Sequence, residues 1–151
     1  QVDPRNIHAY VMGEHGDSEF VPWSQAFLAT KSILELDPEL ESSLTTHLFR
    51  IEEEVRTAAY KIIEAKKATY YGIGMALTRI TKAILRGMST VFLRYLPCSE
   101  ANMTKGMYLP VFLDPESERG TEDIAVVINK EEKEKFDASC DILREGYEGI
   151  L

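Results

Sequence analysis

The apolar residues recur most regularly at spacings of three and four positions, which is the period of an α-helix with one buried face. Asp37 and Pro38 form a helix-start signal ahead of the longest such stretch. Its apolar positions are Leu44, Leu48, Ile51, Val55, Ala58, Ala59, Ile62 and Ile63. Further helices are predicted over residues 69–85 and from Glu131 onward. The stripe of the last helix consists of Phe136, Cys140, Leu143 and Tyr147.

Shorter apolar runs at residues 7–12, 91–93, 108–113 and 124–128 are typical of strands, although the alternation in the last three is poor. Just after the first run, Gly13 and Gly16 flank His15 in a segment that reads as a tight loop. This mixture predicts one α+β domain, in which long helices pack on a small antiparallel sheet.

Composition narrows the possible functions of such a domain. The 151 residues suffice for one core, and a net charge of −8 disfavours binding to nucleic acid. An uncharged apolar run long enough to cross a membrane is absent from the sequence. Cys98 and Cys140 suggest neither a disulfide framework nor a metal site, which fits a reducing cytoplasm.

His15 is the first candidate for chemistry. Imidazole titrates near neutral pH, so it can both donate and accept a proton. The flanking glycines would let a substrate approach closely, and the nearby Glu14 and Asp17 would favour the protonated ring. From these features alone, a histidine in such a loop could equally be a surface or structural residue.

The string around His15 resembles a known signature. Residues 12–18 (MGEHGDS) are similar to the active-site motif of the L-lactate/malate dehydrogenase family. Residues 2–10 (VDPRNIHAY) and 58–73 (AAYKIIEAKKATYYGI) extend the likeness, which covers residues 1–85 almost continuously and resumes over 131–143. Glu14 resembles the lactate branch, because the malate branch usually has glycine there. The resemblance implies the C-terminal substrate domain of a bacterial-type enzyme that interconverts lactate and pyruvate with NAD, in the cytoplasm and as a homotetramer.

The resemblance also implies residue roles. His15 would exchange a proton with the substrate oxygen while nicotinamide exchanges hydride with the same carbon. Thr69 would line the substrate pocket or, alternatively, serve helix packing. Ile73 would contact the nicotinamide ring or be a plain core residue. His8 matches the position that binds a sugar-bisphosphate (fructose bisphosphate) activator in allosteric members, and could equally be an interface residue. Lys67 stands where many members have glycine.

The chain carries no glycine-rich dinucleotide fingerprint. In the family, the Rossmann domain, the substrate-clamping arginine and the aspartate that orients the histidine all precede the segment equivalent to this one. We therefore expect an N-terminal dinucleotide-binding domain outside these 151 residues and no turnover from this chain alone. Two alternatives remain open: half of a dehydrogenase for malate or another 2-hydroxy acid, and a non-catalytic remnant or oligomerising fragment.

Residues 88–129 do not resemble the family, although both flanks do. Codons can be chosen for residues 88–99, 101–113 and 116–129 such that shifted reading frames produce family-like strands and turns in the right order. Our hypothesis is that small insertions or deletions scrambled this segment, and the alternative is a divergent insert. Because a register error exposes the apolar face of a strand, the segment is expected to be poorly packed or loop-like. Cys98 would then carry no function.

Overall fold

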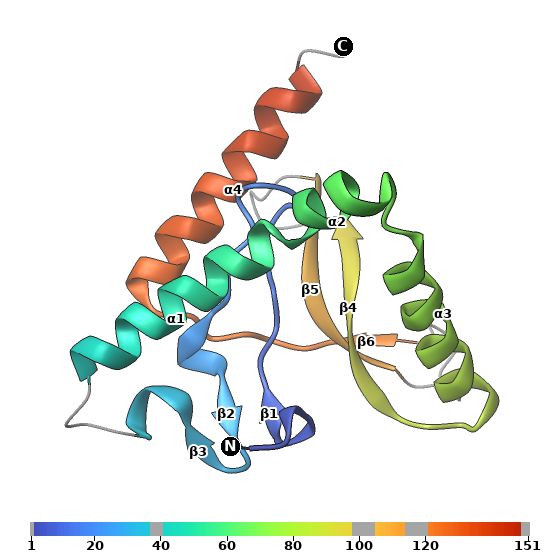
Figure 1. Ribbon diagram of the computed structural model, residues 1–151, viewed down its shortest axis with the longest axis horizontal. Coiled ribbons are helices and arrows are strands. Elements are labelled where there is room, and N and C mark those ends of the chain that lie inside the picture. Colours follow the sequence, from blue (N-terminus) through green and yellow to red (C-terminus); the bar gives the residue numbers. More distant parts are fainter. Residues whose placement is uncertain (1, 37–40, 98–104, 114–120, 149–151) are drawn as a thin grey trace.

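The computed structural model describes residues 2–36, 41–97, 105–113 and 121–148 (Figure 1). Four α-helices lie in these ranges: α1 (Glu41–Arg56), α2 (Ala58–Lys66), α3 (Tyr70–Leu85) and α4 (Lys130–Glu148). The strands are β1 (Ile7–His8), β2 (Phe27–Leu28), β3 (Lys31–Ser32), β4 (Thr90–Pro97), β5 (Lys105–Leu113) and β6 (Thr121–Asp123). Single 3-10 turns form η1 (Pro4–Asn6), η2 (Trp23–Gln25) and η3 (Ile33–Glu35). The predicted start of the first helix at Asp37 falls outside the described residues.

The predicted α+β class is confirmed, because long helices pack around small antiparallel sheets. The strands form two three-stranded sheets, β1-β2-β3 and β4-β5-β6. In the second sheet, β4 and β5 pair from Thr90 opposite Leu113 to Pro97 opposite Lys105, with an irregularity at Leu96 and Pro97. Figure 1 shows α1 and α4 close together, whereas α3 lies on the other side of β4 and β5.

The first predicted helix is present but divided. Its periodic pattern runs unbroken from Leu44 to Ile63, whereas the structure ends α1 at Arg56 and starts α2 at Ala58. At the junction, the Thr57 hydroxyl donates a hydrogen bond of 2.8 Å to the Glu53 carbonyl oxygen. Such back-bonding by a threonine often accompanies a bend, and Thr57 has a ψ of −4°, although its backbone amide keeps its bond of 3.0 Å to Glu53. The spacing of apolar residues does not predict where such a local interruption of the helix occurs.

The expectation of a poorly packed or loop-like segment at 88–129 is wrong as to loops where β4, β5 and β6 lie, whereas residues 124–129 belong to no strand or helix. The apolar runs there are long enough to pair with each other despite their poor alternation, and Val111 and Leu113 are buried. The strand expected at 124–128 is also absent, since β6 occupies the preceding three residues. Cys98 lies outside the described residues.

The core consists of two clusters beside α1 and α4. In one, Met12 and Phe20 pack against Phe136 and Cys140 of α4, with Val126, Ile128 and Leu143 around them. The other contains Ala26, Ile33 and Leu48, flanked by Trp23 and Leu44. Both clusters join the segment after β1 to the long helices. The predicted stripe of α4 therefore faces the core from Phe136 to Leu143.

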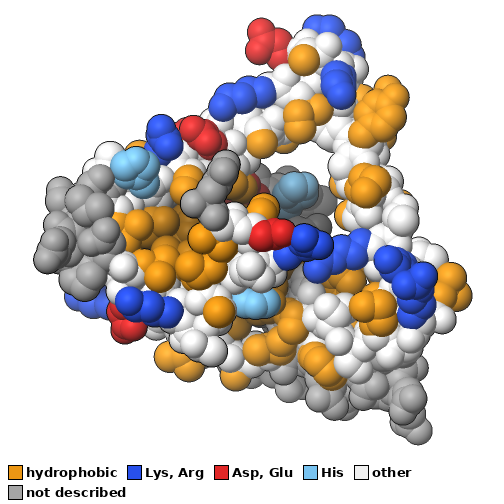
Figure 2. Space-filling model, turned by 60° about the horizontal axis from the view of Figure 1, so that its bottom comes forward, with side chains coloured by type: hydrophobic (Ala, Val, Ile, Leu, Met, Phe, Trp, Pro, Cys, Tyr) orange, Lys and Arg blue, Asp and Glu red, His pale blue; other side chains and the backbone are white. Residues whose placement is uncertain are grey.

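By contrast, α2 and α3 bury little of their own surface. Ala83 is the buried residue of α3. The large apolar side chains that α3 exposes are Tyr70, Tyr71, Ile73, Met75, Leu77, Ile80, Ile84 and Leu85. Figure 2 shows one face of the molecule, on which apolar side chains are widely exposed. In the described part of the chain, no helix is long and apolar enough to span a bilayer.

Candidate active site

The loop that carries His15 is closed at its base by a two-way backbone contact. The amide of Met12 donates to the carbonyl oxygen of Phe20 at 2.9 Å, and the amide of Phe20 returns a bond of 3.0 Å. Gly13 then turns the chain with φ at +106°, a conformation that side chains disfavour. His15 follows near the tip of the loop, and its side chain is 79% exposed. The imidazole is therefore presented on a short, anchored loop.

A carboxylate lies beside the ring. Nδ1 of His15 is 3.9 Å from Oε2 of Glu19, too long for a hydrogen bond but close enough for electrostatic attraction. Burial raises the pKa of Glu19, and the charges of His15 and Arg56 partly oppose that rise. Sequence reasoning had named Glu14 and Asp17 as the acidic neighbours and had missed Glu19.

Helix α2 contacts the loop at Asp17, two residues after His15. The Tyr60 hydroxyl donates a hydrogen bond of 2.6 Å to Oδ1 of Asp17. This bond, together with the negative charge of Asp17, raises the pKa of Tyr60. Asp17 thus fastens the loop to α2. Because 43 residues separate the two partners, no local pattern could have indicated the contact.

Helix α4 contacts the loop at Glu14, through Ser139, which is 0% exposed. The Glu14 amide donates to Oγ of Ser139 at 2.7 Å. Sequence reasoning missed this residue as well. A signal existed, because Ser139 lies three positions after Phe136 and four before Leu143, on the stripe that predicted the buried face of α4.

His15 and Ile73 share one open cavity of about 300 Å³. Its lining residues are Val11, Met12, Gly13, Glu14, His15, Glu19, Ile73 and Leu93. The structure thus brings together two of the predicted site residues from segments 58 positions apart in the sequence. Thr69 is not among the lining residues. It precedes α3 as its exposed N-cap and makes no side-chain capping bond.

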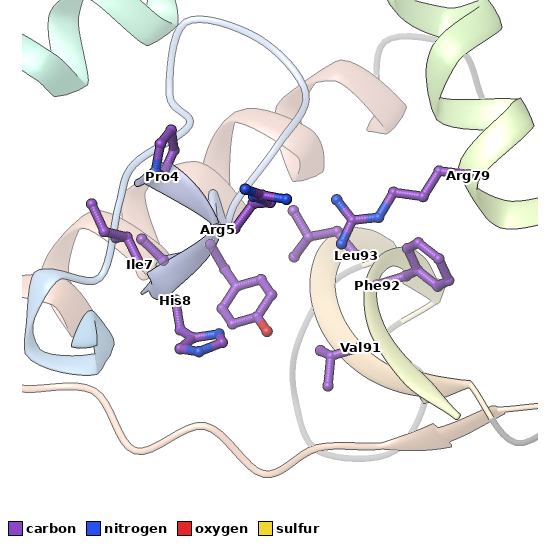
Figure 3. A pocket seen from close by; sticks show the side chains of 10 residues that line it. Pro4, Arg5, Ile7, His8, Arg79, Val91, Phe92 and Leu93 are labelled. Atoms are coloured by element: carbon purple, nitrogen blue, oxygen red, sulfur yellow. The ribbon is translucent and has the colours of Figure 1, made fainter. Parts of the chain in front are cut away.

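His8 lines a different cavity of about 550 Å³ (Figure 3). Arg5 and Arg79 contribute to the same lining, and the Arg79 guanidinium lies 5.8 Å from the centre of the Phe92 ring. Arg5 is held by a short ion pair of 2.6 Å with Asp3. The structure therefore separates His8 from the cavity at His15 and places it in a lining that also contains two arginines.

This fold and this loop define an α+β domain that presents a histidine at the edge of an open cavity. The family model for the alpha/beta C-terminal domain of lactate/malate dehydrogenases matches residues 1–150. The chain belongs to this family, as its sequence resemblance predicted.

Relatives and solved structures agree with this assignment. "L-lactate dehydrogenase 2" from a strain of Bacillus cereus is 41% identical over 99% of this chain, which covers 48% of that protein. The crystal structure of a lactate dehydrogenase from a Medee basin deep-sea metagenome library superposes with a TM-score of 0.82 at 38% identity, covering 95% of this chain and 46% of the other. The malate dehydrogenase of Aeropyrum pernix shares the fold, with a TM-score of 0.79 at 20% identity. The superposition covers 98% of this chain and 48% of that enzyme. The chain spans about half the length of the curated relatives it matches.

The residues present fit one end of the NAD molecule that the family implies. Val11, Ile73 and Leu93 give the His15 cavity an apolar wall that suits a flat ring such as nicotinamide. The phosphates would need another cradle, because the sequence contains no G-x-G-x-x-G motif. Among the described residues, no group of three histidine, cysteine or acidic side chains is placed to hold a metal ion.

Proposed function

We propose that this chain is the substrate half of an NAD-dependent L-lactate dehydrogenase. The observation that carries the proposal is the position of His15, on an anchored loop and in the same cavity as Ile73. In this role, the imidazole gives a proton to the pyruvate oxygen or takes one from the lactate hydroxyl. NAD, when bound, supplies or removes the hydride at the adjacent carbon.

Two further residues complete this half of the proposed site. Ile73 would pack against the nicotinamide ring and exclude water from it. Thr69 would line the substrate pocket from the start of α3, which requires the partner half to extend the cavity described here. That half would also supply the dinucleotide cradle and a cationic clamp for the substrate carboxylate.

We propose that His8 contacts the phosphate of a sugar-bisphosphate activator. Its cavity supports this role chiefly through Arg79, whose guanidinium donors suit phosphate, whereas the guanidinium of Arg5 already donates to Asp3. The family resemblance further supports a cytoplasmic homotetramer for the whole enzyme. The exposed apolar residues of α3 are available for contacts with the rest of such an assembly.

The decisive experiment joins this chain to the dinucleotide-binding half of the Bacillus cereus relative and measures lactate-dependent reduction of NAD. His15→Asn should lower kcat/KM about a thousandfold, because a general acid–base contributes about that factor. His47→Asn, on the exposed surface of α1, is the matched control and should retain the full rate. A His15→Asn hybrid as active as the parent would refute the proposed role.

A second hybrid tests the malate alternative, which the fold shared with the Aeropyrum malate dehydrogenase keeps open. It joins this chain to the dinucleotide-binding half of that enzyme, because the joined half supplies the clamp for the substrate carboxylate. Turnover of malate by this hybrid, with no turnover of lactate by the Bacillus hybrid, would identify the chain as half of a malate dehydrogenase. A folded hybrid inactive on both acids would favour a non-catalytic remnant. The 151-residue chain alone should show no turnover in the same assay.

A further inference from the structure

Three residues of the His15 loop and α4, namely Glu14, Ser18 and Ser139, form a closed hydrogen-bonded ring through two hydroxyls and both the amide and the carboxylate of Glu14. The Glu14 amide donates to Oγ of Ser139 at 2.7 Å, and the Ser18 hydroxyl donates to Oε2 of Glu14 at 2.6 Å. Oγ of Ser18 and Oγ of Ser139 are 3.0 Å apart. Glu14 and Ser139 are 125 residues apart in the sequence, so the ring joins the loop to the last helix.

The donors in this ring follow from the number of hydrogens available. A serine hydroxyl has one hydrogen, and that of Ser18 is already directed to the Glu14 carboxylate. In the contact between the two serines, Ser139 must therefore be the donor. Its oxygen accepts from the Glu14 amide while its hydrogen goes to Ser18, so both of its polar functions are used. A fully buried hydroxyl with this arrangement meets the requirement that buried polar groups be bonded.

The loop also approaches Ser139 as closely as its backbone allows. A Cβ atom on Gly13 would lie 2.9 Å from Oγ of Ser139, closer than real contacts permit. A Cβ atom on Gly16 would collide with the Glu14 carboxylate that the ring holds in place. A side chain at Gly13 would therefore crowd Ser139, and its positive φ favours glycine as well. A side chain at Gly16 would push aside the end of Glu14 and so disturb the ring.

We propose that Ser139 is a positioning residue for His15. It fixes the backbone and the carboxylate of Glu14, the residue immediately before the histidine, and so sets the direction in which the imidazole is presented. This inference rests on the proposed function of His15 for its catalytic meaning. The contact between Ser139 and the loop can be tested without any reaction.

Amide hydrogen exchange in the 151-residue chain provides that test. In Ser139→Ala, exchange at Glu14 should become at least tenfold faster, because the amide loses its acceptor. The amides of Met12 and Phe20, which bond to each other's residues at the loop base, should change less than threefold. Ser24→Ala is the matched control, since it removes another serine hydroxyl that bonds to α4, through Glu132, and should leave Glu14 unchanged.

A second variant covers the case in which Ser139→Ala disturbs the whole core and accelerates all three amides. Ser18→Ala opens the ring on the partly buried side, and exchange at Glu14 should then rise about threefold while Met12 and Phe20 keep their rates. Unchanged exchange at Glu14 in both variants would overturn the proposal. So would equal acceleration of all three amides in both.

Catalysis gives an independent readout in the hybrid enzyme. Ser139→Ala should lower kcat about tenfold with little change in KM for lactate, since small misplacements of a reacting group affect the chemical step. In a His15→Asn background it should have no further effect, because its contribution acts through the imidazole. An undiminished kcat in Ser139→Ala would refute positioning. A hybrid without dehydrogenase activity would refute the proposed function, whereas the exchange result would still decide the contact.

Discussion

The part of the chain around α4 and the part around α3 differ in how they use their apolar residues. At α4, Phe136 and Cys140 are buried against Met12 and Phe20 from the opposite end of the sequence. At α3, Ala83 is buried while eight large apolar side chains are exposed. Both helices nevertheless have a clear apolar period. A periodic pattern therefore predicts that one helix face is apolar, but it does not predict which part of the protein covers that face.

The exposed apolar face of α3 therefore indicates a surface that packs against another domain or subunit. Ile73, Leu77 and Ile80 follow one side of the helix with Ile84, as in the buried stripe of α4. A chain that spans about half the length of its relatives would leave such a face uncovered. This agrees with the proposal that a dinucleotide-binding half completes the site next to Ile73.

The strongest test of this difference between the two regions is to truncate a methionine side chain to alanine in each of them. Met12 is 2% exposed and Met75 is 72% exposed. Met12→Ala should lower the free energy of unfolding by about 2 to 5 kcal/mol, because it leaves a cavity in the core. Met75→Ala should change it by no more than about 0.5 kcal/mol. Urea unfolding followed by circular dichroism measures both values.

Each variant is the control for the other, since the atoms removed are identical. Similar losses in the two variants would mean that α3 is covered in solution, for example by a second copy of the chain. In that case the loss at Met75 should depend on protein concentration. Similar small changes would mean that the core around α4 is not formed.

The sequence predicted the helices better than the sheets, for a physical reason. Helical periodicity is local and survived even in α3, where the covering surface is missing. Strands of two or three residues, such as β1 and β6, are specified by pairing across the chain and leave almost no periodic trace. The composition of segment 124–128 predicts a strand, but Val126 and Ile128 instead help to cover the α4 core while Val127 is exposed.

The residues of the candidate site likewise fall into those that the sequence predicted and those that it did not. A local motif identified His15, and the family resemblance brought in Ile73, which the structure places in the same cavity. Tyr60 and Ser139, which hold the loop, were missed because their contacts depend on tertiary packing. The reading-frame hypothesis for residues 88–129 stays a prediction. The nucleotide sequence tests it, since the required codons are either present or absent.

A smaller effect is expected at Lys67, between the two exposed helices. Lys67 ends α2 with φ at +63°, the left-handed conformation in which helices usually place glycine. Lys67→Gly should therefore raise the free energy of unfolding by about 0.5 to 1 kcal/mol, as relief of backbone strain exceeds the added freedom of the unfolded chain. Thermal unfolding detects this as a higher Tm.

The matched control is Lys61→Gly, which changes an exposed lysine in the interior of α2. There the same exchange should lower the free energy of unfolding by about 0.5 to 1 kcal/mol, because glycine is a poor helix former. Two changes of the same sign would show that the left-handed turn at Lys67 is not formed. Opposite signs would show that local backbone geometry holds the α2–α3 connection, where side-chain packing contributes little.

The smallest expected effect is electrostatic and lies on the packed side of the molecule. Burial raises the pKa of Glu19, so the folded protein holds that proton more tightly than the unfolded chain does. The sign follows directly: stability from this group is complete at low pH and decreases as pH rises above about 4.3, the usual pKa of glutamate. The charged groups that act on it are His15 and Arg56, which lower its pKa, and Glu14 and Asp17, which raise it.

Glu19→Gln should therefore stabilise the chain by less than about 1 kcal/mol at pH 7 and leave it nearly unchanged at pH 4. Urea unfolding at the two pH values measures this difference, and Glu64→Gln on exposed α2 controls for the loss of one charge. If Glu19→Gln instead destabilises at pH 7, attraction to His15 and Arg56 outweighs the cost of burial. The carboxylate would then be held beside the imidazole by its charge, and the loop would depend on that ion pair as well as on its anchoring contacts.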